Sequence, residues 1–204
     1  MSDLLSADTL KQWLRDAHQC PPAQDETLLP DAMTPAAVLV PLILRASGIT
    51  LLLTQRTAHL HNHAGQISFP GGRVDAEDVD YVAAALREAE EEVGLVARQI
   101  EVIATLPRYR TGTGFRIEPV VALVTPPLNL KLDDFEVADV FEVPLPFVLD
   151  ESNWKRESRE FDGEFGKVLR EFWAIPWRDH YIWGATAAMI VSFKRCLDHG
   201  RDAA

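Results

Sequence analysis

The alternation of apolar and polar residues predicts a chain built mainly of strands. Runs rich in Val, Ile and Leu at 36–44 and 49–53 flank Ser47-Gly48, which is typical of a buried strand pair. The other strand-like runs are 67–69, 100–105, 117–124, 139–143, 155–160 and 168–175. Residues 161–165 between the last two runs predict a hairpin tip.

Helical periodicity occurs in three places. Residues 80–93 form the clearest helix, and Gly94 follows it at the position where a left-handed residue is usual. A short amphipathic helix is predicted over 6–19, with Ser6 or Asp8 as its cap, and a final helix over 184–198. The turn before the central helix is predicted at Pro70-Gly71-Gly72. Strands dominate, so an α+β or α/β sandwich fits better than a regular βαβ array.

Proline and polar residues divide the chain unevenly. Pro21-Pro22 ends the first helix, and a polar stretch to Pro35 reads as a linker. We therefore expect an N-terminal helix and linker over 1–34 and one domain over 35–204. The first helix packs either on this domain or on a second subunit. With 204 residues, of which 47% are apolar, the chain is long enough to bury a core.

Charge narrows the classes of partner. Lys and Arg number 20 against 31 Asp and Glu, which gives a formal net charge of −11. Nucleic acids and anionic membranes call for a basic face, so neither is an expected partner. An anionic substrate would need local arginines or a bound cation. Cys20 and Cys196 show no metal-binding or disulfide spacing, and no export signal is visible, so a cytoplasmic location is expected.

The central helix carries a cluster of carboxylates. Its apolar stripe has steps of four, three and four: Val82, Leu86, Ala89 and Val93. Glu88, Glu91 and Glu92 fall on roughly the opposite face, where like charges repel. Two interpretations stay open, a solvated acidic face or a site for a divalent cation such as Mg²⁺, which prefers hard oxygen ligands.

The surrounding residues favour the cation. The run Gly72-Arg73-Val74-Asp75-Ala76-Glu77-Asp78, followed by Arg87-Glu88-Ala89-Glu90-Glu91-Glu92-Val93-Gly94-Leu95, resembles the Nudix box. Every defined position of its tail matches. Eight residues stand between Asp78 and Arg87, whereas the usual acidic residue is a Glu with seven residues between it and the Arg. This departure argues against a direct role for Asp78.

A second block resembles the signature of the coenzyme A pyrophosphatase branch of that family. It comprises Leu52-Leu53-Thr54-Gln55-Arg56-Thr57 and Gly65-Gln66-Ile67-Ser68-Phe69-Pro70-Gly71-Gly72. Thr57 replaces the usual small residue, and His61 stands where a second Arg is usual. Residues 181–187 are similar to the start of the branch's C-terminal helix.

The resemblance implies a fold and a site. The fold would be a Nudix-type α/β/α sandwich with a mixed β-sheet. Mg²⁺ or Mn²⁺ would be held by Glu88 and Glu92, then Glu91 and the Gly72 carbonyl, while Arg87 would hold Glu88 in place. The general base stays open among Glu88, Glu136, Asp139 and Glu142; we choose Glu88 because it would lie beside the metals.

The resemblance also implies a reaction. Hydrolysis of the pyrophosphate bond of coenzyme A, or of an acyl-CoA, would give 3′,5′-ADP and 4′-phosphopantetheine. The residues nearest to the expected substrate site are Gly71, Arg56 and Arg73, followed by Arg108 and Arg110. A homodimer is a further implication. Two alternatives remain, a Nudix hydrolase of ADP-ribose, NADH or another nucleoside diphosphate derivative, and a catalytically silent Nudix-fold binding module.

Overall fold

The computed structural model describes residues 5–21, 33–59, 64–163 and 166–204. Its main strands are β1 (Thr34–Arg45), β2 (Gly48–Arg56), β3 (Ile67–Ser68), β4 (Gly71–Arg73), β5 (Ile100–Thr105), β6 (Tyr109–Arg110), β7 (Phe115–Val124) and β8 (Val137–Pro144). The α-helices are α1 (Ala7–Trp13), α2 (Tyr81–Val93), α3 (Leu145–Leu149) and α4 (Gly184–Asp202). In the described residues, no helix has the length and apolar character needed to cross a membrane.

The central sheet is mixed. Its strands run in the order β3-β2-β1-β7-β5, with β1 antiparallel to β2 and parallel to β7. The predicted strand pair at 36–44 and 49–53 is confirmed, and both strands extend beyond the predicted bounds. The long apolar run of β1 follows from its central place, because a strand covered on both faces has no polar side.

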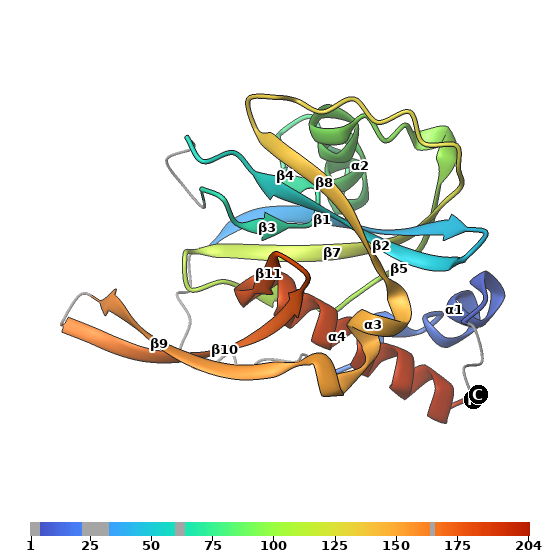
Figure 1. Cartoon of the computed structure of the whole chain (residues 1–204). Helices are drawn as coiled ribbons and strands as arrows, with labels where there is room; N and C mark the ends of the chain where they lie inside the picture. Colours follow the sequence, from blue (N-terminus) through green and yellow to red (C-terminus); the bar gives the residue numbers. More distant parts are fainter. Residues whose placement is uncertain (1–4, 22–32, 60–63, 164–165) are drawn as a thin grey trace.

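The two faces of β1 pack against different helices. Val38 and Val40 belong to the core shared with α1 and α4, whereas Ala37 and Leu39 belong to the core shared with α2. This division follows from the alternation of side chains along a strand. The result is an α/β/α sandwich, with α2 on one side of the sheet and α4 on the other (Figure 1). The predicted fold class is confirmed.

The N-terminal segment packs on the domain itself. The single helix predicted over 6–19 is wrong in length, since α1 ends at Trp13 and a 3₁₀ turn follows at Ala17–Gln19. Ser6 caps α1 by accepting from the Thr9 backbone N–H at 3.1 Å. Leu10 is fully buried in the core shared with α4. A Cβ at Gly200 would overlap the Trp13 carbonyl, so a glycine in α4 permits the close approach.

The segment before α2 differs from the prediction. Pro70-Gly71-Gly72 was expected to be a turn, but Gly71–Arg73 forms β4 and pairs antiparallel with β1. Glycine is needed here because Gly71 has a φ of 154°, and a Cβ on it would lie 2.6 Å from the Val38 Cα. Asp80 caps α2 by accepting from the Ala83 N–H at 2.8 Å, and Gly94 closes it at a φ of 74° as predicted.

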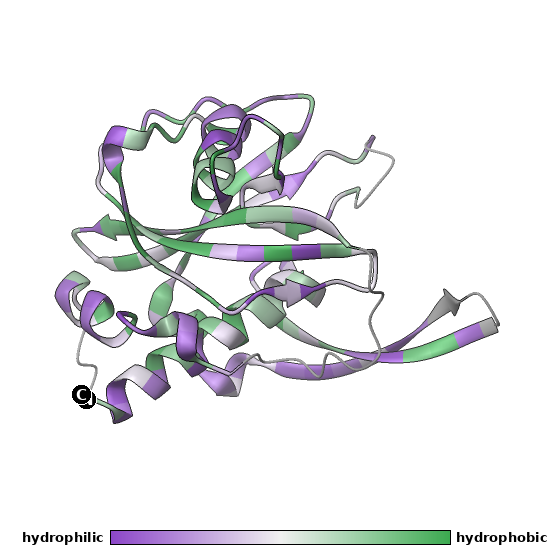
Figure 2. Ribbon diagram, turned by 180° about the vertical axis from the view of Figure 1, so that it is seen from behind, coloured by the Kyte–Doolittle hydropathy of each residue, from purple (hydrophilic) through white to green (hydrophobic). Residues whose placement is uncertain are grey.

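A second, three-stranded sheet carries a long hairpin. Its order is β11-β10-β9, with β9 (Lys155–Gly163), β10 (Gly166–Trp177) and β11 (His180–Trp183). The hairpin was predicted; β6, α3 and β11 were not. The hairpin projects from the body (Figure 1) and is mostly hydrophilic, whereas apolar positions gather in the central sheet (Figure 2).

Candidate active site

The carboxylates of α2 do not share one solvated face. The buried residues of the helix are Ala84, Ala85, Ala89, Glu92 and Val93. Glu92 is only 4% exposed, so placing it on the face opposite the apolar stripe is wrong. It follows Ala85 by seven positions, two helical turns, and therefore points toward the sheet. The side chain of Glu91 is 60% exposed, and that of Glu88 is 18% exposed.

Glu92 lies against β4 and the end of β2. Its Oε2 accepts the Gly71 backbone N–H at 3.1 Å, and its Oε1 lies 3.6 Å from Arg56 Nη1. Burial raises the pKa of Glu92 to about 8, although the Gly71 N–H and Arg56 both act to lower it. Glu88 and Glu136 add to the rise through their negative charge. The rise in pKa thus comes first from burial and only then from neighbouring carboxylates.

Glu88 faces the backbone of β4. A Cβ at Gly72 would lie 2.5 Å from the Glu88 carboxyl carbon, so a side chain here would displace this carboxylate. Burial raises the pKa of Glu88, while Arg87 opposes the rise by a hydrogen bond. Gly71 thus donates its N–H to Glu92. Gly72 has no side chain, and the Glu88 carboxylate lies where a Cβ would be.

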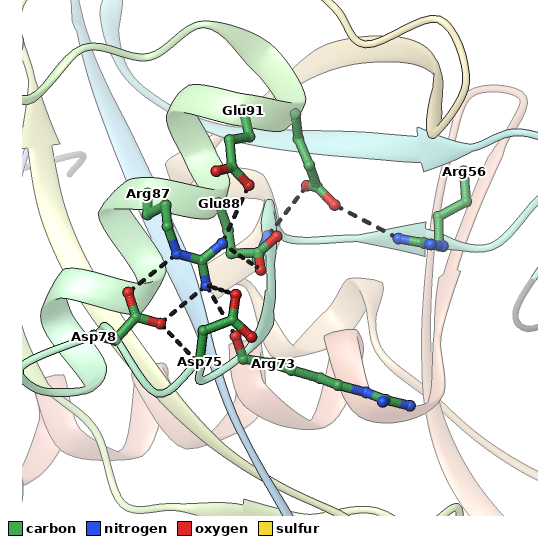
Figure 3. A network of polar contacts seen from close by, with 9 residues as sticks. Arg56, Arg73, Asp75, Asp78, Arg87, Glu88 and Glu91 are labelled. Atoms are coloured by element: carbon green, nitrogen blue, oxygen red, sulfur yellow. Dashed lines mark hydrogen bonds and ion pairs between the residues drawn. The ribbon is translucent and has the colours of Figure 1, made fainter.

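Arg87 is the centre of the polar network in Figure 3. Its Nη1 donates to Glu88 at 3.0 Å, as predicted, and to Glu91 at 3.1 Å. Its Nε and Nη2 donate to the two carboxylate oxygens of Asp78 at 3.1 and 3.0 Å. A further bond joins Nη2 to the Arg73 carbonyl at 3.1 Å. Arg87 therefore ties α2 to the loop that follows β4.

Asp78 belongs to this network, although its spacing in the sequence argued against a role. Its side chain is 5% exposed, and its hydrogen bonds from Arg87 hold the pKa of its carboxyl below the usual value. The backbone N–H of Asp75 also donates to it at 2.8 Å. The loop accommodates the extra residue before Arg87, and both carboxylate oxygens of Asp78 accept hydrogen bonds from Arg87. Only the folded loop reveals this.

Arg56 joins a further carboxylate to the site. Its Nη2 lies 3.6 Å from Glu136, just before β8, while its Nη1 faces Glu92. The Thr57 N–H donates to the Glu136 carbonyl at 3.0 Å, which fixes the segment beside β2. The sequence named Glu136 among the candidate bases, but only folding brings it to Arg56.

The remaining candidates lie elsewhere or point away. The Arg73 side chain extends away from the carboxylates (Figure 3), with its guanidinium 5.7 Å from the Phe115 ring centre. Arg108 pairs with Glu118 at 2.7 Å. Glu142 accepts hydrogen bonds from Arg45 and Thr50 and contacts neither Arg56 nor Arg87, which disfavours it as a base.

The residues around Gly72 fit a hard divalent cation in kind. Carboxylates and a backbone carbonyl are the ligands that Mg²⁺ and Mn²⁺ prefer. Six carboxylates contact Arg56 and Arg87 in this cluster, so acidic groups outnumber these arginines. The missing Cβ of Gly72 lets the Glu88 carboxylate lie against the backbone of β4. As arranged here, no three His, Cys, Asp or Glu side chains of the described residues form a group that could hold a metal, and Arg87 lies between Glu88 and Glu91.

The chain is thus an α/β/α protein with a mixed sheet between two helical layers. Its anionic site lies where the second half of α2 packs on the glycine pair of β4. A family model described as the NUDIX domain matches residues 33–163, more than half of the chain. The chain belongs to the Nudix family. It is a Nudix hydrolase, and this family acts on small nucleoside diphosphate compounds and generally uses divalent metal ions.

Similar proteins carry the same family name. The chain is 44% identical over 156 residues to a protein of Citrobacter koseri named "Uncharacterized Nudix hydrolase NudL", covering 76% of this chain and 78% of that protein. A protein of the same name from Escherichia fergusonii is 43% identical with the same coverage. Among solved structures, a Nudix hydrolase from M. Smegmatis, RenU, is 27% identical and covers 58% of this chain and 75% of that chain, with a TM-score of 0.49.

Proposed function

We propose that this Nudix hydrolase cleaves the pyrophosphate bond of coenzyme A, or of an acyl-CoA, with Mg²⁺ or Mn²⁺. The products would be 3′,5′-ADP and 4′-phosphopantetheine. The observation that carries the proposal is the carboxylate pair Glu88 and Glu92 against Gly71-Gly72, in a cluster where six carboxylates contact two arginines, Arg56 and Arg87. Such an excess is tolerable when a cation occupies the site.

The proposed ligands are Glu88, Glu92, Glu91 and the carbonyl of Gly72. Bound divalent ions would polarise a phosphoryl oxygen and lower the pKa of a bound water. Arg87 positions the carboxylates of Glu88 and Glu91 by hydrogen bonds and is itself fixed by Asp78. It acts through these residues, without contact to substrate.

A bound cation would also explain how an acidic chain binds an anionic substrate. A protein of net charge −11 repels a polyanion. Divalent ions between the carboxylates and the diphosphate would replace that repulsion with attraction on both sides. Substrate affinity should therefore depend on the metal as much as on the arginines.

The block from Leu52 to Gly72 favours coenzyme A within the family. Its Arg56 ends β2 and lies between Glu92 and Glu136, at the edge of the carboxylate site. Its other end, Gly71-Gly72, forms β4 directly beneath α2. The block thus lines two sides of the site, and we propose Arg56, Arg73 and Gly71 as substrate contacts.

Glu88 is the proposed general base, with Glu136 as the nearest alternative. Glu88 has the more buried carboxylate, with 18% of its side chain exposed against 42% for Glu136. Burial raises the pKa of Glu88, which suits a group that must accept a proton. Comparing the pH–rate profiles of E88Q and E136Q assigns the role, since only loss of the base removes the acidic limb.

A substrate panel tests the proposal. Purified protein with Mg²⁺ or Mn²⁺ is assayed against coenzyme A, ADP-ribose, NADH and a dinucleoside polyphosphate. The proposal expects the highest kcat/KM for coenzyme A. Turnover of ADP-ribose alone would overturn the substrate while leaving the family chemistry in place, and no turnover of any compound would favour a silent binding module.

We also propose that the enzyme is cytoplasmic. Cys20 and Cys196 are both free thiols, as a reducing compartment would keep them. Burial raises the pKa of the Cys196 thiol, and a hydrogen bond with Cys20 adds to the rise.

A further inference from the structure

The hairpin has one edge without a neighbouring strand. In the described part of the chain, β9 pairs with β10 and with no other strand. The register runs from Gly163 opposite Gly166 to Lys155 opposite Ala174 without a shift. A long, regular edge of this kind presents unpaired backbone N–H and C=O groups and is a template for another strand.

Most of the hairpin is only two strands wide. The third strand, β11, pairs with residues 174–177 of β10 alone. The outer part, 166–173 of β10 with its partners in β9, therefore has no third strand among the described residues. Two apolar side chains of this part remain in solvent, Val168 with 45% and Leu169 with 67% exposed. A two-stranded ribbon is marginally stable in water, and added strands stabilise it.

The charges along β9 are self-complementary in one register. The strand reads Lys155-Arg156-Glu157-Ser158-Arg159-Glu160-Phe161-Asp162. When two copies lie antiparallel with Ser158 opposite Ser158, Glu157 faces Arg159 of the second copy and Arg156 faces its Glu160. The twofold symmetry repeats both contacts, so every charged pair directly across this short stretch is of opposite sign.

Neighbouring registers lack this property. A shift of one residue in one direction places Glu157 opposite Glu160, and in the other direction it places Arg156 opposite Arg159. A shift by two in either direction places Arg159 opposite itself or Glu157 opposite itself. Like charges directly opposite destabilise a strand pair. The charge pattern thus selects one register and one partner, a second copy of this chain.

From this free edge we infer that the protein forms a symmetric dimer in which β9 pairs antiparallel with β9 of a second copy, centred on Ser158. The two three-stranded sheets then become one continuous sheet across the twofold axis. Ser158, Arg159 and Glu160 are exposed in the single subunit, so this edge is accessible. The dimer uses no residue of the carboxylate site, and its test is independent of the substrate.

Cross-linking tests the register. In S158C the two new thiols face each other, and the Cα separation of directly opposed residues, about 4.5 or 5.5 Å, suits a disulfide. Mild oxidation should convert S158C to a covalent dimer. The control S152C places an exposed thiol outside β9, while the buried Cys20 and Cys196 are common to both variants. Failure of S158C to cross-link, or equal cross-linking of S152C, would overturn the inference.

Charge exchange tests the complementarity. R159E places a carboxylate opposite Glu157 of the second copy at two symmetric contacts, so the dimer dissociation constant should rise roughly 10- to 100-fold in sedimentation equilibrium. The double variant E157R/R159E restores opposite charges and should restore the dimer. Circular dichroism and hydrolase activity check that each variant is folded. A wild-type chain that stays monomeric over the concentration series, or a double variant no tighter than R159E, contradicts the inference.

Discussion

Glu90 and Glu92 lie two positions apart on α2, but their side chains have different surroundings. Glu90 is exposed, whereas Glu92 is buried against the Gly71 N–H and Arg56. The sequence identified the cluster and led to the prediction of a cation site there, yet it placed Glu92 on the face opposite the apolar stripe. Charge patterning could not find the difference, because β4 lies beneath α2 only after the chain has folded.

The first prediction compares these two residues. E92Q removes the charge of a proposed metal ligand and should lower kcat/KM by about 10²- to 10³-fold, which is the usual scale for loss of a group that stabilises developing charge. E90Q should retain wild-type activity because Glu90 is exposed on the same helix. Steady-state kinetics with saturating metal measure both, and unchanged circular dichroism shows that the fold is kept. Near-equal rates for the two variants would remove Glu92 from the site.

Asp78 gives a second prediction, for a positioning residue. D78N keeps the shape of the side chain but weakens the hydrogen bonds that fix Arg87. We expect the apparent affinity for the divalent ion to fall about 10- to 100-fold, the range for residues that orient ligands. The metal concentration giving half-maximal rate measures this, and D78E is the rescue variant. An unchanged metal dependence would leave Asp78 with a purely structural role.

At the scale of elements, the ends of α2 were predictable and its neighbour β4 was not. Asp80 and Gly94 are local signals, since a side-chain cap and a left-handed residue mark helix ends wherever the helix packs. Gly71-Gly72 reads locally as a turn, but its strand character comes from pairing with β1, more than thirty residues earlier. Long-range pairing of this kind leaves no periodic signal in three residues.

Gly94 provides a third prediction. Its φ of 74° disfavours any side chain, and a Cβ there would lie 2.8 Å from the Lys131 backbone nitrogen. Gly114 has a φ of 87° with open space around it. G114A should therefore cost about 1 kcal/mol of the free energy of unfolding, and G94A more than that. Chemical denaturation measures both, and equal losses would show that Lys131 moves aside freely.

The contact among β1, β2 and β8 gives a fourth prediction, on pH. Arg45 Nε donates to Glu142 at 3.1 Å, and the Thr50 hydroxyl donates to the same carboxylate. These bonds hold the pKa of Glu142 below its ordinary value of 4.5. The folded chain therefore releases this proton more readily than the unfolded chain, so the stabilisation is full above pH 4.5 and is lost as pH falls below it.

E142Q measures that contribution. The variant should lose about 1 kcal/mol at neutral pH, with a smaller difference from wild type in acid. Its hydrolase activity should be unchanged, because the Glu142 carboxylate bonds to Arg45 and Thr50 rather than to Arg56 or Arg87. Denaturation at a series of pH values gives the first result and kinetics the second. A large loss of activity would instead return Glu142 to the candidate bases.

At the scale of the whole molecule, the sandwich places one buried carboxylate cluster at the junction of α2, β4 and β2. Apolar runs and helical periodicity were enough to predict an α+β or α/β sandwich, whereas the α/β/α layering was predicted from the resemblance to the Nudix box. Burial on both faces of β1 and on one side of α2 and α4 accounts for these layers. The meeting of Arg56, Glu92 and Glu136 was not predictable, since it depends on three segments brought together by strand pairing. Membership of the Nudix family follows from the match of residues 33–163 to the family model.

Binding of Mn²⁺ shows whether the carboxylate cluster at the junction of α2, β4 and β2 holds a divalent ion. Electron paramagnetic resonance counts free Mn²⁺ during titration of the protein without substrate, which separates binding from turnover. We predict saturable binding to the wild-type chain and to E90Q, and its loss in the double variant E88Q/E92Q. Equal Mn²⁺ binding by all three proteins would contradict the account, because the ion would then lie elsewhere.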